Sequence, residues 1–589
     1  MRRLANLLST AAIFAFLTTF GGCTDGSAEP DVDSINTKPS DESIEQSQGL
    51  SDKESRYLQD AEHLGGFVFG DVVLPAVRDA IAKSDRAQLA RFLAPSFNGG
   101  IYDVQQFGNA DLQFASINTW TDADGVVSCT GEEFVDWLIN MRSEFAELQS
   151  ASIKVMQMSP VEYGEFEKQW NGSIKLRLAG RLENGDLRET VVKMNCSIDG
   201  IDDDMQDRDE WLLQASAYRA DVATGTGYLM HDVTSSTGVD TSQFRDNWDH
   251  VEELPIPFLT GGVYVTDFDK DQLQDLLITD LNGVFFYRGL PGLKFEQVTV
   301  DVGLPSVIAN SEKAPLGAMF ADLDNDGYDD LILGQTVYRN DNGMRFRRLT
   351  AADTNIKLST ASYRYSVVDF DLDGKLDIYV VGLRVSAEKA QPWIGDVEGH
   401  RNQLWKNLGD WQFEDATDAA GIAGSGGPTF AAVWYDANGD KWPDVMTSIE
   451  MGQNDYFLNN GDGTFRKGEL PEGYGGFSMG ITVSDINNDG LGDPYVANMY
   501  SKAGERILGN LNPELYDSEI DNLMRDFVTG NELYQNNGDG TYSRIGQLAG
   551  VNDVGWAYGA TFMDLDGDGL EDMYAPVGFQ SVDPNKPDG

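Results

Sequence analysis

One nine-residue pattern occurs six times in the second half of the chain. Each copy begins with Asp and has Asp or Asn at its third, fifth and ninth positions. The copies begin at residues 267, 322, 369, 436, 485 and 564, at intervals of 55, 47, 67, 49 and 79 residues. A repeat of about 50 residues predicts an architecture in which one small structural unit is stacked several times.

The residues around each copy predict the structure of this unit. A short apolar segment such as GATFMD leads into the pattern, and a second one such as MYAPVG follows it. A hairpin such as YFLNNGDGTF comes next, and its Asn and Gly residues supply the positive φ angles of a tight turn. Four short strands in about 50 residues are typical of a propeller blade. We therefore expect a mainly β fold, with a β-propeller of six or seven blades over residues 255–589.

The repeated pattern also predicts metal sites. Oxygen atoms at alternate positions of a tightly turned loop point toward one centre, and Ca²⁺ takes six to eight oxygen ligands in flexible geometry. Mg²⁺ fits less well because it requires a strict octahedron and retains its waters. Without an ion the carboxylates repel one another, by about 1–4 kcal/mol for a pair 4 Å apart. We expect up to six bound Ca²⁺ ions.

The predicted ligands are the residues at positions one, three, five and nine of each copy. They are Asp267, Asp269, Asp271 and Asp275; Asp322, Asp324, Asp326 and Asp330; Asp369, Asp371, Asp373 and Asp377; Asp436, Asn438, Asp440 and Asp444; Asp485, Asn487, Asp489 and Asp493; and Asp564, Asp566, Asp568 and Asp572.

The alternative to metal binding is a set of Asp-rich surface turns, because Asp is a common turn residue. Six copies of one spacing, each between two apolar segments, argue against that alternative. Individual copies still differ. Gln272 and Lys441 replace the Gly that stands at position six of the other copies, and Lys441 adds a positive charge beside its site. The sixth copy is followed by one apolar strand and no aromatic hairpin, so we expect closure by N-terminal strands, an open ring or a truncated chain.

The segments LYQNNGDGTY and GATFMDLDGDGLEDMYAP resemble the FG-GAP/VCBS repeats of integrin-α-type propellers. Within that family they look like the branch of cartilage acidic protein and the ASPIC/UnbV proteins. The resemblance covers about residues 255–580. It implies a calcium-stabilised propeller, usually of seven blades, that presents loops for adhesion or ligand binding.

The N-terminus predicts export. Two arginines precede a mostly apolar stretch, residues 4–20, which is too short to span a bilayer comfortably. The stretch ends in FGGC, which resembles a bacterial lipoprotein signal. We therefore expect residues 1–22 to be a signal peptide and Cys23 to carry the lipid; an ordinary secretory signal is the alternative. Residues 23–55 are rich in polar and acidic residues, which predicts a disordered tether.

Residues 56–245 predict a separate α+β domain. Thr130 and Glu133 have capping-box spacing, and the apolar residues that follow recur every three or four positions, as in a helix with one buried face. Residues 187–196 and 210–219 read as strands. Helices followed by an antiparallel sheet faintly resemble the nuclear-transport-factor-like (SnoaL-like) cone folds. A small ligand in such a cone is a further hypothesis.

Charge and cysteine content narrow the possible partners. The net charge of −53 makes nucleic acid a poor partner, since both molecules are polyanions. Cys129 and Cys196 could form a disulfide or remain two buried thiols. None of the four His residues has the spacing of a catalytic or metal-binding motif, and no catalytic residue or further cofactor is predicted.

Two functions follow from these observations. The first is a lipid-anchored, calcium-binding propeller at the cell surface or in the periplasm that binds an extracellular glycan or protein. The second is an extracytoplasmic enzyme that acts on polysaccharides. The enzyme requires a converging set of Arg, Tyr, His and carboxylate side chains at the ring axis, outside the metal loops. The sequence favours the binding protein, because its most obvious carboxylates belong to the predicted metal loops.

Overall fold

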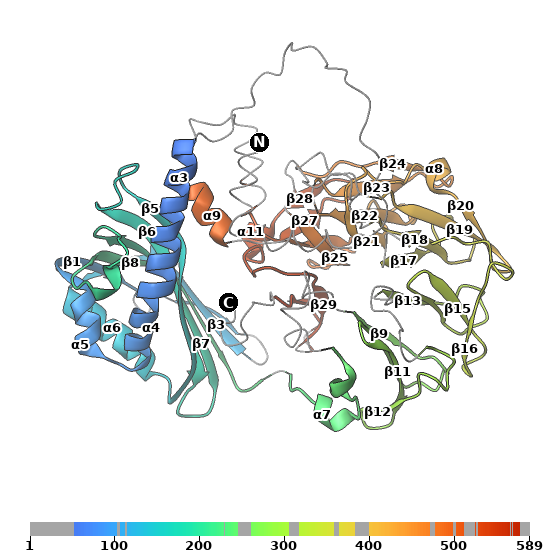
Figure 1. The fold of residues 1–589 in the computed structure, drawn as a ribbon, viewed down its shortest axis with the longest axis horizontal. Coiled ribbons are helices and arrows are strands. Elements are labelled where there is room, and N and C mark those ends of the chain that lie inside the picture. Colours follow the sequence, from blue (N-terminus) through green and yellow to red (C-terminus); the bar gives the residue numbers. More distant parts are fainter. Residues whose placement is uncertain are drawn as a thin grey trace, which may run out of the picture.

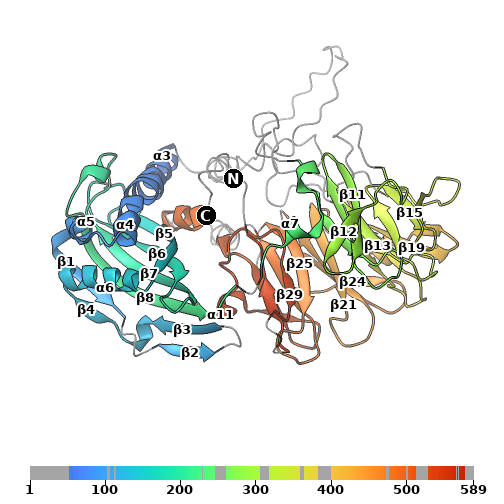
Figure 2. The ribbon, with the colours of Figure 1, turned by 90° about the horizontal axis from the view of Figure 1, so that it is seen from below.

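The computed structural model of the chain describes residues 52–102, 107–111, 115–228, 230–245, 261–305, 317–358, 364–382, 400–450, 452–471, 477–498, 502–511, 525, 528–565, 567 and 569–577. The predicted signal peptide, Cys23, most of the predicted tether, Asp566 and Asp568 lie outside these residues. The described chain forms an N-terminal α+β region beside a series of small antiparallel sheets (Figures 1 and 2). Within it, no helix is both long and apolar enough to cross a lipid bilayer.

The N-terminal region begins with a helical segment made of α3 (Asp52–Ala61), η2 (Glu62–Val73) and α4 (Leu74–Ala82). Pro75 lies in the first turn of α4, where its missing N–H group costs no hydrogen bond. The helices α5 (Arg86–Phe92) and α6 (Gly131–Ser143) follow. The capping box of α6 is confirmed, because the Thr130 N–H donates to the Glu133 carboxylate at 2.7 Å and the Glu133 N–H donates to Thr130 Oγ1 at 3.4 Å.

These helices pack on one face of a curved eight-stranded sheet with the order β2-β3-β8-β7-β6-β5, in which β1 pairs with β8 and β4. The strands are β1 (Leu93–Ile101), β2 (Gly108–Asp111), β3 (Ala115–Thr121), β4 (Val127–Cys129), β5 (Glu147–Pro160), β6 (Trp170–Arg181), β7 (Leu187–Ile198) and β8 (Leu212–Gly225), with short 3₁₀ turns η4 (Asp122–Asp124) and η5 (Met205–Asp207). Between helices and sheet lies a cavity of about 40 Å³ beside Phe134 and Trp211. Small-molecule sites usually measure about 300–1,000 Å³, so this cavity is part of the core. Cys129 and Cys196 are both buried and unpaired.

The second region contains, in the described residues, five four-stranded sheets and one two-stranded sheet, numbered here sheets 1 to 6. Their strands are β9 (Val263–Thr266), β10 (Asp275–Asp280), β11 (Gly283–Leu290) and β12 (Lys294–Gln297); β13 (Ala318–Ala321), β14 (Asp330–Leu333), β15 (Thr336–Asn340) and β16 (Phe346–Arg348); β17 (Tyr365–Val368), β18 (Asp377–Val380), β19 (Gln403–Gly409) and β20 (Gln412–Asp415); β21 (Thr429–Tyr435), β22 (Asp444–Ile449), β23 (Asp455–Asn459) and β24 (Phe465–Lys467); β25 (Ser478–Ser484), β26 (Asp493–Asn498), β27 (Glu532–Asn536) and β28 (Tyr542–Arg544); and β29 (Thr561–Met563) with β30 (Asp572–Tyr574). The short helical turns α7 (Thr234–Thr237) and η6 (Thr241–Gln243) precede sheet 1, whereas α8 (Thr417–Ala420) lies between sheets 3 and 4 and α11 (Gly546–Ala549) between sheets 5 and 6.

The sheets are arranged side by side in chain order. The first strands β9, β13, β17, β21, β25 and β29 contact one another in that sequence and surround a common centre (Figure 1). Apolar side chains fill the space between neighbouring sheets; Phe268, Phe286, Leu331 and Phe346, for example, join sheets 1 and 2. Each Asp-rich loop connects the first strand of a sheet to the second. The predicted mainly β fold and its four-stranded unit are therefore confirmed.

A helix inserted into sheet 5 connects the two regions. The helix α9 (Lys502–Gly509) follows β26, within the insertion, and contacts β5 and η2 of the N-terminal region (Figure 1). Leu508 is buried in the core of that region. Arg506 forms an ion pair with Glu62, and Asn510 Nδ2 donates to the Met158 carbonyl at 2.9 Å. Apolar and ionic contacts therefore hold the two regions together in addition to the chain that connects them.

Candidate metal centres

The Asp-rich loops, numbered here loops 1 to 6, share the backbone geometry of their fourth and sixth positions. The residues at positions four and six have positive φ angles in every loop, between 57° and 90° except for 54° at Leu372. In every loop the position-one carboxylate accepts the N–H of residue six, at 2.8–3.1 Å. This geometry explains the Gly at position six, and it is kept where Gln272 (φ 72°) and Lys441 (φ 74°) replace it.

The left-handed backbone at Lys441 gives a stability prediction. In this conformation a residue with a Cβ atom is less favourable than glycine by about 1–2 kcal/mol of conformational free energy. Part of this difference is offset because the unfolded chain has less backbone entropy with lysine than with glycine. We expect Lys441→Gly to raise the free energy of unfolding by up to about 1 kcal/mol, measured by urea denaturation. Gly490→Lys, at the same position of loop 5, is the matched reverse change and should lower it by a similar amount. Destabilisation by Lys441→Gly would contradict this account.

In loops 1, 2 and 3 the carboxylates converge. Three ligand oxygens lie within 4.8 Å of one another in each of the groups Asp267, Asp269 and Asp271; Asp322, Asp324 and Asp330; and Asp369, Asp371 and Asp377. The Oδ1 atoms of Asp267, Asp269, Asp324 and Asp371 are buried and have no hydrogen-bond partner. Buried acceptors without donors are unfavourable unless something else binds them. A hard divalent cation among these oxygens fits that requirement.

The position-nine carboxylates have a structural role in addition. Asp330, which is fully buried, accepts the Leu323 N–H at 3.0 Å and the Asn340 N–H at 2.8 Å, and so ties the loop to the third strand. Asp275, Asp377, Asp444 and Asp493 accept the equivalent pairs of N–H groups. Burial raises the pKa of Asp330 to about 8 and that of Asp377 to about 7, although these hydrogen bonds oppose the shift. A neighbouring cation would favour the ionised form again.

Loops 4, 5 and 6 differ from the first three. Asn438 and Asn487 occupy position three, and each donates through Nδ2 to the position-five carboxylate, Asp440 or Asp489, at 2.9 Å. In loop 6, Asp564 accepts the N–H groups of Gly567 and Gly569, and Asp572 accepts that of Leu565. Among the described residues of these three loops, no group of three carboxylates converges as in loops 1 to 3.

Sequence reasoning missed an Asn at or near the end of the third strand of four sheets. Asn340, Asn407, Asn459 and Asn536 are buried, and each donates through Nδ2 to the carbonyl of residue two in the loop of the preceding sheet, at 2.8–3.0 Å. Sheet 1 has Gly289 at this position. The recurrence of Asn at one place in the hairpin was the available signal. Each of these Asn residues therefore fastens one Asp-rich loop to the next sheet.

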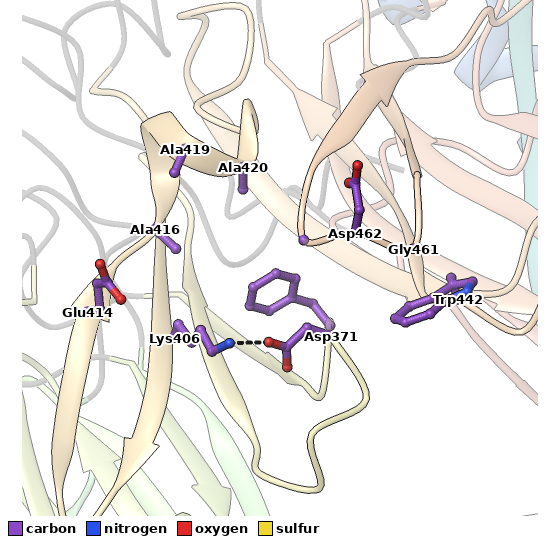
Figure 3. Close-up of a pocket in the computed structure, with 11 residues that line it drawn as sticks. Asp371, Lys406, Glu414, Ala416, Ala419, Ala420, Trp442, Gly461 and Asp462 are labelled. Atoms are coloured by element: carbon purple, nitrogen blue, oxygen red, sulfur yellow. Dashed lines mark hydrogen bonds and ion pairs between the residues drawn. The ribbon is translucent and has the colours of Figure 1, made fainter.

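A pocket of about 410 Å³ opens between sheets 3 and 4 (Figure 3). Sheet 3 contributes the Asp371–Lys406 ion pair and Glu414, while sheet 4 contributes Trp442 of loop 4 and Asp462 of its hairpin (Figure 3). Its volume lies within the usual range of ligand sites. An aromatic ring beside several charged groups can bind a molecule that has both an apolar face and hydroxyl or amide groups.

The converging polar set required by the enzyme alternative has a partial counterpart near the starts of the first strands. Arg364 of sheet 3 acts electrostatically on Tyr264 of sheet 1 and on Glu450 of sheet 4, and Glu450 acts on Tyr558. Burial raises the pKa of Glu450 to about 7, and Arg364 opposes the shift. Glu450 is only 2% exposed, however, so its carboxyl group faces the protein interior and not a surface that a polysaccharide can reach.

A family model described as an FG-GAP-like repeat matches residues 267–333, 436–496 and 517–575. The chain contains FG-GAP-like repeats. The matched segments include loops 1, 2, 4, 5 and 6, and loop 3, which lies outside them, has the same backbone. FG-GAP-like repeats are therefore shown in three parts of the sheet region, whereas the ASPIC/UnbV branch and the lipoprotein signal stay predictions.

No curated protein matches the chain. Among solved structures, it is similar to an Agrocybe aegerita lectin that recognises non-reducing terminal N-acetylglucosamine, with 18% identity over 54% of this chain and 75% of the lectin, and a TM-score of 0.35. It is also similar to the V. cholerae biofilm matrix protein Bap1, with 16% identity over 49% of this chain and 40% of Bap1, and a TM-score of 0.27.

Proposed function

We propose that the chain is a calcium-binding β-propeller, anchored outside the cytoplasm through a lipid on Cys23, that binds an extracellular glycan or protein. The observation that carries the calcium part is the convergence of three carboxylates in each of loops 1 to 3, with buried oxygens that have no hydrogen-bond donor. Bound Ca²⁺ would neutralise these carboxylates and be coordinated by their oxygens. The carboxylates at positions one and nine also stabilise the loop by accepting backbone N–H groups.

The ions have a structural role in this proposal. Loops 1 to 3 lie between the first and second strands, and Asn340, Asn407 and Asn459 of the following sheets donate to the carbonyl groups of Phe268, Leu323 and Phe370 within them. An ordered loop therefore places its residue-two carbonyl where the Asn side chain of the next sheet can donate to it. The proposed binding pocket shares one residue, Asp371, with the converging carboxylates of loop 3.

The pocket between sheets 3 and 4 is the proposed place for a sugar unit of the glycan. Trp442 and Asp462 line one side of the pocket, and Lys406 and Glu414 line the opposite side, so the lining combines an aromatic face with hydrogen-bonding groups (Figure 3). Asp371 also belongs to loop 3, so the pocket borders a proposed calcium site. Loss of the ion is expected to disturb the pocket, which makes binding calcium-dependent.

A screen of the whole protein against printed glycans and extracellular proteins, with Ca²⁺ and with EDTA, tests this function. We expect binding in Ca²⁺ that falls on the order of tenfold or more for Trp442→Ala, because truncation of a central aromatic contact typically has such an effect. Trp442→Phe keeps an aromatic face and should retain most of the affinity. Absence of any calcium-dependent ligand contradicts the proposed function. Equal binding by Trp442→Ala contradicts only the proposed location.

The anchor has its own test. Expression of the full chain in a bacterium with a lipoprotein export pathway is expected to place it in the membrane fraction and to attach labelled palmitate. Cys23→Ser should abolish labelling and release the protein into the soluble extracytoplasmic fraction, because one lost lipid removes the hydrophobic attachment. Cys129→Ser, at a buried cysteine of the folded region, is the control. Labelling of Cys23→Ser would rule out this anchor.

A further inference from the structure

The third strands of sheets 1, 2 and 3 each place a basic side chain against the position-three Asp of their own loop. Arg288 Nε lies 3.2 Å from Asp269 Oδ2, and Arg339 Nε lies 2.9 Å from Asp324 Oδ2. Lys406 Nζ forms the same ion pair with Asp371 Oδ2. In all three loops the basic group contacts Oδ2, while the buried Oδ1 of the same carboxylate has no hydrogen-bond partner. The carboxylate therefore has one oxygen beside a cationic side chain and one buried oxygen without a donor.

Sheets 4 and 5 lack both halves of this pair. The residue at the same position of the third strand is Leu458 in sheet 4 and Gln535 in sheet 5, and neither is charged. Position three of their loops is Asn438 or Asn487 in place of Asp. The two changes occur together in both sheets. An Asp with a Lys or Arg carries the same total charge as an Asn with a neutral residue. Positions one, three, five and nine, counted together with this strand residue, therefore have the same net charge in all five loops.

We propose that Arg288, Arg339 and Lys406 are built-in counter-ions of the metal loops. Each neutralises the position-three Asp, orients its Oδ1 toward the loop centre and keeps the net charge offered to a divalent ion the same as in loops 4 and 5. The position-three side chains of loops 4 and 5 need no counter-ion because an amide is neutral. These basic residues are positioning residues: they act through the carboxylate and are not ligands themselves. The inference rests on the proposed calcium function.

The physical basis is the cost of an unpaired, partly buried carboxylate. The side chain of Asp324 is only 12% exposed, and Asp322 and Asp326 lie in the same loop. Removing one partner of a desolvated pair leaves the other charge uncompensated, which is more destabilising than removing both partners. The counter-ion matters most when no metal is bound, because the ion then does not share in neutralising the loop.

A double-mutant cycle in loop 2 tests the inference. In EDTA, the melting temperature of Arg339→Leu is expected to fall by several degrees, and added Ca²⁺ should stabilise this variant more than it stabilises the wild type, because loop 2 is now more negative. Arg339→Leu combined with Asp324→Asn gives sheet 2 the neutral pair found in sheets 4 and 5, an Asn at position three and an uncharged residue on the third strand. This double variant should recover most of the lost melting temperature. Arg339→Lys should behave like the wild type, since loop 3 uses Lys406.

Loop 5 provides the reverse cycle. Gln535→Arg alone places an unpaired cation beside the neutral Asn487 and should weaken the stabilisation by Ca²⁺. Gln535→Arg combined with Asn487→Asp recreates the pair of loop 2 and should restore the stabilisation by Ca²⁺. The inference is wrong if Arg339→Leu is as stable as the wild type in EDTA, or if the double variant is no better than the single one. If the EDTA results follow expectation but Ca²⁺ does not stabilise even the wild type, the pairing stands and the calcium function fails.

Discussion

Chelation of divalent cations is expected to lower the melting temperature of the sheet region by about 15 °C. A ligand present at 100 times its Kd stabilises the folded state by about 2.7 kcal/mol per site, so three independent sites contribute about 8 kcal/mol. For a domain of this size, 1 kcal/mol corresponds to roughly 2 °C. The three sites in this estimate are those where carboxylates converge, in loops 1 to 3.

The experiment is a calorimetric melt of the full chain in EDTA, in Ca²⁺ and in Mg²⁺. Ca²⁺ added back to the chelated protein should restore the transition, and equal Mg²⁺ should restore less, because Mg²⁺ demands a stricter geometry. The N-terminal region has no Asp-rich loop of this pattern, so any separate transition of that region should respond less. An unchanged melting temperature in EDTA would falsify calcium stabilisation.

The sheet region could be predicted from sequence because its signals are local. Alternating acidic residues, the Gly at position six and the Asn-Gly hairpins all act within a few residues, and positions four and six have positive φ angles in each copy. The same local reasoning treated Gln272 and Lys441 as weak points of the pattern. Both adopt the positive φ of glycine, because the position-one carboxylate and the flanking strands fix the loop whichever residue occupies position six.

The candidate site was predictable only in part. The Asp residues of loops 1 to 3 were identified, but the basic partners Arg288, Arg339 and Lys406 lie 15 to 35 residues beyond the position-three Asp residues they contact. Their role depends on where the third strand brings them, and a repeat pattern in one chain does not show this until the strands are aligned. The pocket between sheets 3 and 4 depends on two sheets and had no sequence signal of its own.

In the N-terminal region, too, features set by neighbouring residues were predictable and contacts between distant segments were not. The capping box of α6 is read from two residues three positions apart, and it formed as expected. The docking of α9 on β5 joins segments more than 300 residues apart, and the sequence shows at α9 only the long interval of 79 residues between loops 5 and 6. Local hydrogen bonds are therefore readable, whereas contacts between regions depend on the assembled fold.

Asn459→Ala is expected to lower the free energy of unfolding of the sheet region by about 4 kcal/mol. Asn459 is 2% exposed; its Nδ2 donates to the Phe370 carbonyl at 2.8 Å and to the Pro443 carbonyl at 3.1 Å, and its Oδ1 accepts the Gly461 N–H at 3.0 Å. Alanine leaves all three backbone groups buried without this partner, at about 1–3 kcal/mol for each group. The Phe370 contact is the one that joins sheet 4 to loop 3.

The adjacent residue offers a matched control. Asn460 is exposed and its Nδ2 bonds only to Thr464 Oγ1 of the same hairpin, at 3.0 Å, so Asn460→Ala should change the free energy of unfolding by less than about 0.5 kcal/mol. Urea denaturation in saturating Ca²⁺ measures both variants, and hydrogen exchange should show faster exchange in residues 364–382 for Asn459→Ala alone. Equal stabilities of the two variants would mean that this Asn does not couple the sheets. A loss confined to Asn459→Ala, together with faster exchange in sheet 3, would show that each loop is stabilised by the sheet that follows it.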